Sequence, residues 1–102
     1  MTQVIEAPSS VTVRSAGEFA GQLLAAVQTG GDIDMDIAAL EDVDLSFIQL
    51  VLATRTHLEQ EGARLGLVQP AGPALAALLD RAGFGDPRPA DLDFWFHGEL
   101  PQ

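Results

Sequence analysis

Asp32-Ile33-Asp34-Met35-Asp36-Ile37 is the stretch of the chain that indicates its fold class. Apolar and acidic residues alternate in it, so a strand would carry Ile33, Met35 and Ile37 on one face and three aspartates on the other. A central strand covered by helices on both sides would be apolar on both faces. The segment therefore predicts an α/β domain whose helices pack on one face of the sheet only.

Segments on both sides of this stretch continue an alternation of strands and helices. Ser15 and Glu18 resemble a capping box at the start of a helix whose apolar face is Phe19, Leu23, Leu24 and Val27. In chain order, we expect an edge strand near 3–7, a strand over 10–14 with Val11 and Val13 inward, a helix ending at 29, the strand over 32–37, a helix from 45 to about 61, a strand over 64–68, a helix over 73–82 and a last strand over the aromatic segment 92–97. These elements predict a mixed sheet of four to five strands in a single domain over residues 1–102.

Composition and charge narrow the classes of function. The chain has 102 residues, no cysteine and a formal net charge of -10, and its five basic residues are arginines scattered at positions 14, 55, 64, 81 and 88. Binding of nucleic acid needs a basic surface that neutralises phosphates, so we expect no nucleic-acid partner. The chain has no secretion signal and no apolar run of about 18 residues, which predicts a cytoplasmic protein without membrane insertion.

Four segments together resemble a STAS domain. They are the strand 32–37, the run Val43-Asp44-Leu45-Ser46-Phe47-Ile48-Gln49-Leu50-Val51-Leu52, the segment 62–68 and the segment 79–84. The resemblance covers nearly the whole chain. It implies the fold of anti-sigma-factor antagonists, of stand-alone STAS proteins of bacterial signalling and of the cytoplasmic STAS subunit in phospholipid-transport complexes.

The resemblance assigns a role to the segment that begins at Asp44. In anti-sigma-factor antagonists, an aspartate at this place is followed directly by a phosphorylatable serine or threonine. Asp44 matches the aspartate, but the next residue is Leu45, which has no hydroxyl, and Phe47 occupies the usual glycine position. Ser46, one step later, is a candidate phosphorylation site, and Asp44 is also well placed to cap the helix.

The helix that follows Asp44 offers a candidate docking surface for a protein. Its expected outer side is almost uncharged, and charged residues are depleted from the cores of interfaces. We therefore expect partner-binding residues at Asp44, Ser46, Gln49, Ala53 and Thr56. The alternation of the aspartates explains them as the wet face of a strand, so no metal site is expected. No cofactor and no catalytic residue is expected either, because the serines and glycines match no catalytic or phosphate-binding motif.

The sequence thus predicts a non-enzymatic protein-interaction regulator of bacterial signalling, associated with two-component or chemotaxis pathways. Its expected partner is a kinase, an anti-sigma factor or another signalling protein. The alternative is a cytoplasmic STAS subunit of an ABC-type phospholipid transport complex, in which the same helix would dock against the transporter ATPase.

Overall fold

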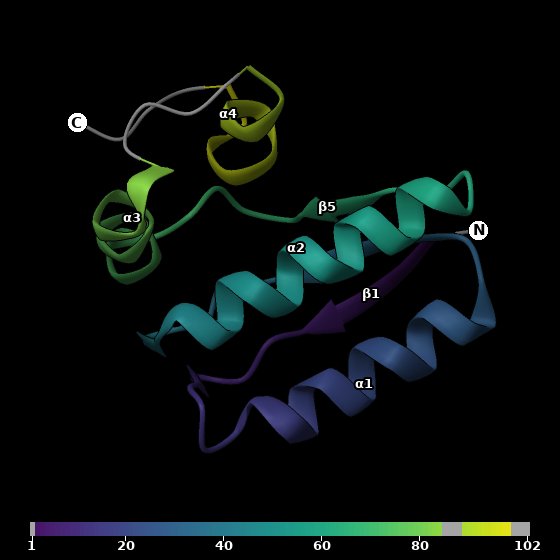
Figure 1. Cartoon of the computed structure of the whole chain (residues 1–102), viewed down its shortest axis with the longest axis horizontal. Coiled ribbons are helices and arrows are strands. Elements are labelled where there is room, and N and C mark those ends of the chain that lie inside the picture. Colours follow the sequence, from purple (N-terminus) through teal and green to yellow (C-terminus); the bar gives the residue numbers. More distant parts are fainter. Residues whose placement is uncertain (1, 85–88, 99–102) are drawn as a thin grey trace.

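A computed structural model describes residues 2–84 and 89–98 of the chain. Its elements are β1 (Thr2–Glu6), β2 (Ser10–Val11), α1 (Ala16–Thr29), β3 (Asp32–Asp36), β4 (Asp42–Val43), α2 (Leu45–Gln60), β5 (Leu65–Leu67), α3 (Pro73–Leu79), a π-helical turn over Asp80–Phe84 and α4 (Pro89–Phe96). Figure 1 shows α1 and α2 side by side, with β5 and α4 beyond α2. None of the described helices is long and apolar enough to cross a bilayer.

The described strands form two small parallel sheets rather than one mixed sheet of four to five strands. The larger has the order β1-β3-β5, and the smaller pairs β2 with β4. In the larger sheet Val4 lies opposite Asp34, and Asp34 lies opposite Gly66. The prediction of a mixed sheet was wrong. The chain passes through α1 between β1 and β3, and through α2 between β3 and β5, so each strand starts again at the same end of the sheet. A strand that returns through such a helical crossover pairs in parallel.

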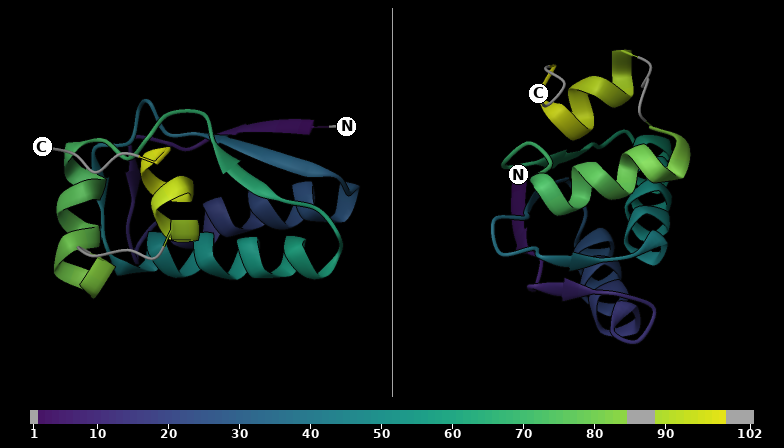
Figure 2. Two further views of the ribbon diagram at one scale, coloured as in Figure 1. Left: turned by 90° about the horizontal axis from the view of Figure 1, so that it is seen from above. Right: turned by 90° about the vertical axis from the view of Figure 1, so that its left-hand side faces the viewer.

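The helices α1 and α2 cover one face of the larger sheet, as the alternation in β3 predicts. Figure 2 shows both helices on the same side of the strands. Ile33, Met35 and Ile37 are buried beneath them, whereas the three aspartates of β3 are only half-buried on the other face. Phe19 of α1 stacks on Phe47 of α2 with 6.1 Å between ring centroids. The expected open face is confirmed.

The predicted last strand over 92–97 is wrong, because these residues form most of α4. Phe94, Trp95 and Phe96 are all buried, and the helix packs against the β5 side of the sheet. The Ala71 amide donates to the Trp95 carbonyl at 2.7 Å, and a ring nitrogen of His97 lies 2.9 Å from the Leu67 carbonyl oxygen. Consecutive side chains on a helix point about 100° apart, so the three aromatic rings can contact several elements at once.

Four details around α1 and α3 also differ from the sequence prediction. Val13 is exposed, because β2 ends at Val11 and the chain then turns. Ser15 does precede α1, but its hydroxyl binds the Thr12 amide and the Ser10 carbonyl rather than an amide of the helix. Leu24 is exposed on α1 instead of buried. The predicted helix over 73–82 has regular α geometry only to residue 79 and then continues into the turn over 80–84.

Candidate functional site

Asp44 joins three segments at the beginning of α2. One oxygen of its carboxylate accepts a hydrogen bond from the Ser46 amide at 2.9 Å, which caps the helix as predicted. The other oxygen accepts from the amide of Val13 at 2.9 Å, in the loop between β2 and α1. Asp44 therefore fixes the start of α2 against a loop that lies 31 residues earlier in the sequence.

Ser46 is coupled to Asp44 through its side chain as well. The Ser46 hydroxyl donates a short hydrogen bond to the same carboxylate oxygen that accepts from the Ser46 amide. This hydroxyl and the Val13 amide hold the pKa of Asp44 below its ordinary value, because both stabilise the charged carboxylate. The pair is thus a half-buried hydroxyl beside a carboxylate that is ionised at neutral pH.

The other predicted partner-binding residues follow Ser46 along α2. Gln49, Ala53 and Thr56 are all exposed, at three- and four-residue steps that place them on one side of the helix. We call Ser46, Gln49, Ala53 and Thr56 the outer row of α2. Leu45, at the place where the family's phosphorylated residue is expected, is 50% exposed beside it. The structure therefore brings all five predicted site residues, Asp44 included, to one region of the surface.

An apolar groove lies between α1 and α2, and the sequence prediction missed it. The groove has a volume of about 210 Å³. We call it the α1–α2 groove, and it is lined by Ala20, Leu23, Leu24, Val27, Leu50, Ala53, Thr54 and His57. Ala53 belongs to both the groove and the outer row, so the two surfaces are continuous. Leu24 was expected on the apolar face of the helix that packs on the sheet. That face is wider than the sheet can cover, which could have indicated an additional apolar surface.

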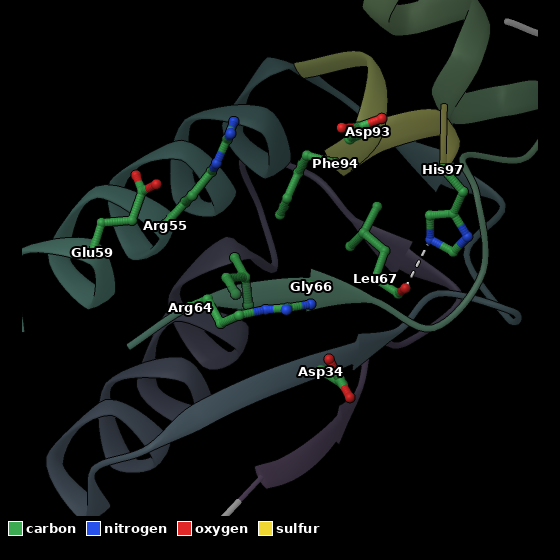
Figure 3. A pocket seen from close by; sticks show the side chains of 10 residues that line it. Asp34, Arg55, Glu59, Arg64, Gly66, Leu67, Asp93, Phe94 and His97 are labelled. Atoms are coloured by element: carbon green, nitrogen blue, oxygen red, sulfur yellow. Dashed lines mark hydrogen bonds between the residues drawn. The ribbon is translucent and has the colours of Figure 1, made fainter. Parts of the chain in front are cut away.

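A second hollow, rich in charge, opens on the opposite side of α2. We call it the α4 pocket; its volume is about 280 Å³ and it is lined by Asp34, Arg55, Glu59, Arg64, Leu65, Gly66, Leu67, Asp93, Phe94 and His97. Figure 3 shows that its charged side chains come from α2, β3, α4 and the residue just before β5, Arg64. The sequence did not indicate this pocket, because its wall is formed by the segment that was expected to be a strand.

Two side chains of the α4 pocket, Arg55 and His97, contact other parts of the domain. Arg55 forms an ion pair with Asp91 at 2.9 Å, and its guanidinium carbon lies 4.7 Å from the centre of the Phe94 ring. His97 contacts the Leu67 carbonyl, as Figure 3 shows. These contacts attach α4 to α2 and β5.

The aspartates of β3 do not converge on a metal-binding point. Among the described residues, no group of three or more histidine, cysteine, aspartate or glutamate side chains could hold a metal ion. Asp36 instead accepts hydrogen bonds from the Ala38 amide at 3.0 Å and from the Gln69 amide group at 2.8 Å. These two donors lower the pKa of Asp36, so its role is to connect the loops after β3 and β5.

Comparison with known proteins gives a family for this architecture. Residues 1–92 match the protein family described as "Mlab, STAS domain". No curated protein and no solved structure gives a significant match. The matched residues include every described strand, α1 to α3 and the site around Asp44 and Ser46. The chain therefore belongs to the STAS domain family.

Proposed function

We propose that residues 1–102 act as a single, non-enzymatic interaction domain in bacterial signalling, which docks a protein partner through Asp44 and the outer row of α2. STAS domains typically mediate interactions between proteins and are generally not catalytic. A kinase, an anti-sigma factor or another cytoplasmic signalling protein is the partner that this proposal favours.

The exposed and uncharged outer row is the observation that carries the proposal. In a chain with a net charge of -10, the three exposed residues Gln49, Ala53 and Thr56 form a neutral strip on the solvent side of α2. Interface cores are poor in charged residues, since each buried charge has to lose its hydration. The strip begins beside Asp44 and Ser46, where a hydroxyl and a carboxylate add polar contacts.

A phosphoryl group on Ser46 would alter this end of the surface. It would replace the hydroxyl proton that forms the hydrogen bond to Asp44. It would also place about two negative charges beside an ionised carboxylate. The repulsion would loosen the contact between α2 and the loop at Val13. We therefore propose that phosphorylation of Ser46 would weaken docking.

The docking proposal is tested with the partner captured from native cells on the purified domain. We expect Gln49→Arg and Ala53→Arg each to weaken binding of that partner at least about tenfold, because each buries a charge in the contact. Both side chains are exposed in the free domain, so the thermal unfolding temperature should not change. Val68→Arg is the matched control, since Val68 is also exposed but lies after β5. Undiminished binding by both arginine variants would refute docking at the outer row.

One observation favours the alternative, a subunit of an ABC-type phospholipid transport complex. Leu45 replaces the residue that carries the phosphoryl group in anti-sigma-factor antagonists, and a surface that is never switched suits a permanent subunit. Capture of a transporter ATPase would support this alternative, whereas a kinase or an anti-sigma factor would support the signalling role. Ser46→Asp gives a second readout, measured against Ser46→Ala. Weaker binding by the aspartate variant alone indicates a switch, and equal binding by both indicates permanent docking.

A further inference from the structure

The α1–α2 groove extends the surface of the proposed function onto a second helix. On α2, Leu50, Ala53 and His57 line the groove at three- and four-residue steps, and Ser46 precedes Leu50 by one such step. Side chains with this spacing lie on one face of a helix, so the groove points toward the Asp44 and Ser46 pair. A partner that contacts the outer row therefore lies directly beside the groove.

The middle of this two-helix surface is neutral. α1 contains one charged residue, Glu18, in its first turn. The charged residues of α2 are Arg55 and Glu59, and both line the α4 pocket on the other side of that helix. Among the described residues that line the groove, only His57 can carry a charge. Leu24, 58% exposed, is the largest apolar side chain that the groove presents to water.

The ends of the surface are negative. α1 and α2 both follow strands of the same parallel pair, so their first turns lie at the same end. At this end the acidic residues Glu18, Glu41, Asp42 and Asp44 outnumber one exposed arginine, Arg14. At the other end Glu61 follows α2, with its carboxylate 3.7 Å from the His57 ring, and the last turn of α1 contains no basic residue that would offset its free carbonyl groups. An apolar centre between negative ends is complementary to an apolar ridge between positive ends.

The surface of α1 also allows a close approach. Gly17 and Gly21 are exposed on this helix, and a Cβ atom added at either position would meet no other atom within 4 Å. Glycine in the interior of an exposed helix, as at Gly21, lowers helix stability relative to alanine. Packing within the described domain does not require glycine at these positions, whereas the backbone of an approaching helix would benefit from them.

We propose that the α1–α2 groove binds an amphipathic α-helix of the partner protein, with an apolar ridge that contacts Leu24 and with lysine or arginine near both of its ends. This inference rests on the proposed function, because it names the structure that the docked partner presents. A helix fits better than an extended strand, since the groove runs between two helices and offers no free backbone groups for strand pairing.

The test uses a defined peptide and the full chain. The probe is a helical peptide as long as α2, 16 residues, with a leucine ridge on an alanine and glutamine background and with lysines at both ends. A matched peptide carries glutamate in place of lysine. In NMR titrations, we expect the lysine peptide to shift signals of Leu24, Leu50, Ala53 and His57, and to bind at least about tenfold more tightly than the glutamate peptide.

Variants of the chain separate the groove from a general attraction to an acidic protein. Leu24→Glu should reduce binding of the lysine peptide at least about tenfold, whereas the control Val68→Glu adds the same charge elsewhere and should leave it unchanged. Gly21→Gln should also weaken binding while the domain stays folded. Shifts centred outside the groove, equal affinity for both peptides, or equal losses in the Leu24 and Val68 variants would each overturn the proposal.

Two outcomes distinguish this inference from the proposed function. If Leu24→Glu leaves binding of the native partner intact while Gln49→Arg abolishes it, the groove proposal fails and docking at the outer row stands. If Gln49→Arg leaves the native partner bound while Leu24→Glu removes it, the groove is supported and docking at the outer row fails. A concentration-dependent dimer of the chain that Leu24→Glu dissolves would make a second copy the occupant and would overturn the proposed partner helix.

Discussion

The α4 pocket and the α1–α2 groove lie on opposite sides of α2, and they use their residues differently. The pocket is rich in charge, yet Arg55 contacts Asp91 and Phe94, and His97 contacts a carbonyl of β5. The groove is apolar, and Leu24 at its rim is left in water. Charged residues in a hollow are commonly taken to indicate a binding site. In this domain Arg55 and His97 of the charged pocket attach α4, whereas the neutral groove leaves the apolar Leu24 exposed to solvent.

The largest effect is expected in α4, whose aromatic side chains are part of the core. Trp95 is fully buried, so Trp95→Ala should lower the free energy of unfolding by about 3–5 kcal/mol through lost contacts and a cavity. Urea unfolding followed by circular dichroism measures this loss. Trp95→Phe keeps much of the volume and should cost clearly less. A loss below about 1 kcal/mol for the alanine variant would show that α4 adds little to the core.

A smaller effect is expected from the charged residues of the α4 pocket. Arg55→Ala removes an ion pair with partly buried side chains and a contact with the face of Phe94, which together should cost about 1–2 kcal/mol. Arg64, exposed in the same pocket, is the control, and Arg64→Ala should change stability by less than about 0.5 kcal/mol. A double-mutant cycle with Asp91→Ala measures the coupling. Equal effects of the two arginine variants would contradict an attaching role for Arg55.

The smallest effect on stability is expected at Asp44, the N-cap of α2, and it depends on pH. Hydrogen bonds lower the pKa of Asp44 from its ordinary value of 3.8. Its charge therefore stabilises the folded state fully above pH 3.8, and this stabilisation is lost as the pH falls through the lowered folded value. Asp44→Asn should be less stable than the natural chain at about pH 6, and the difference should shrink in acid. A difference that is constant from neutral to strongly acidic pH would exclude a role for the charge.

Local patterns in the sequence were sufficient for the elements whose burial has a simple period. The alternation in β3 predicted both its buried residues and the open face of the sheet. The aspartate before α2 predicted the cap, and the spacing along α2 predicted which side would be exposed. These features depend on residues that are close in sequence, so the chain itself contains the information.

Features that depend on distant contacts could not be predicted in this way. The aromatic segment at 94–96 has the composition of a strand, but its docking beside β5 decides that it is a helix. Val13 and Leu24 were placed in the core because they are apolar, although apolar residues also occupy surfaces. The hydrogen bond from the Val13 amide to Asp44 joins two loops that no local pattern connects. The groove between two helices likewise exists only after both have packed.

The parallel strand pairing has a consequence for the way this chain folds. Thr2 pairs with Asp32, Ser10 with Asp42 and Ile33 with Leu65, so every strand pair of the described sheets joins residues about 30 positions apart. No hairpin between neighbouring strands can form early and serve as a local nucleus. During synthesis β1 has to wait until β3 has left the ribosome, and α1 is the first element that can form before that moment. The acidic residues along the open sheet face would help to keep such unpaired strands from associating with other chains.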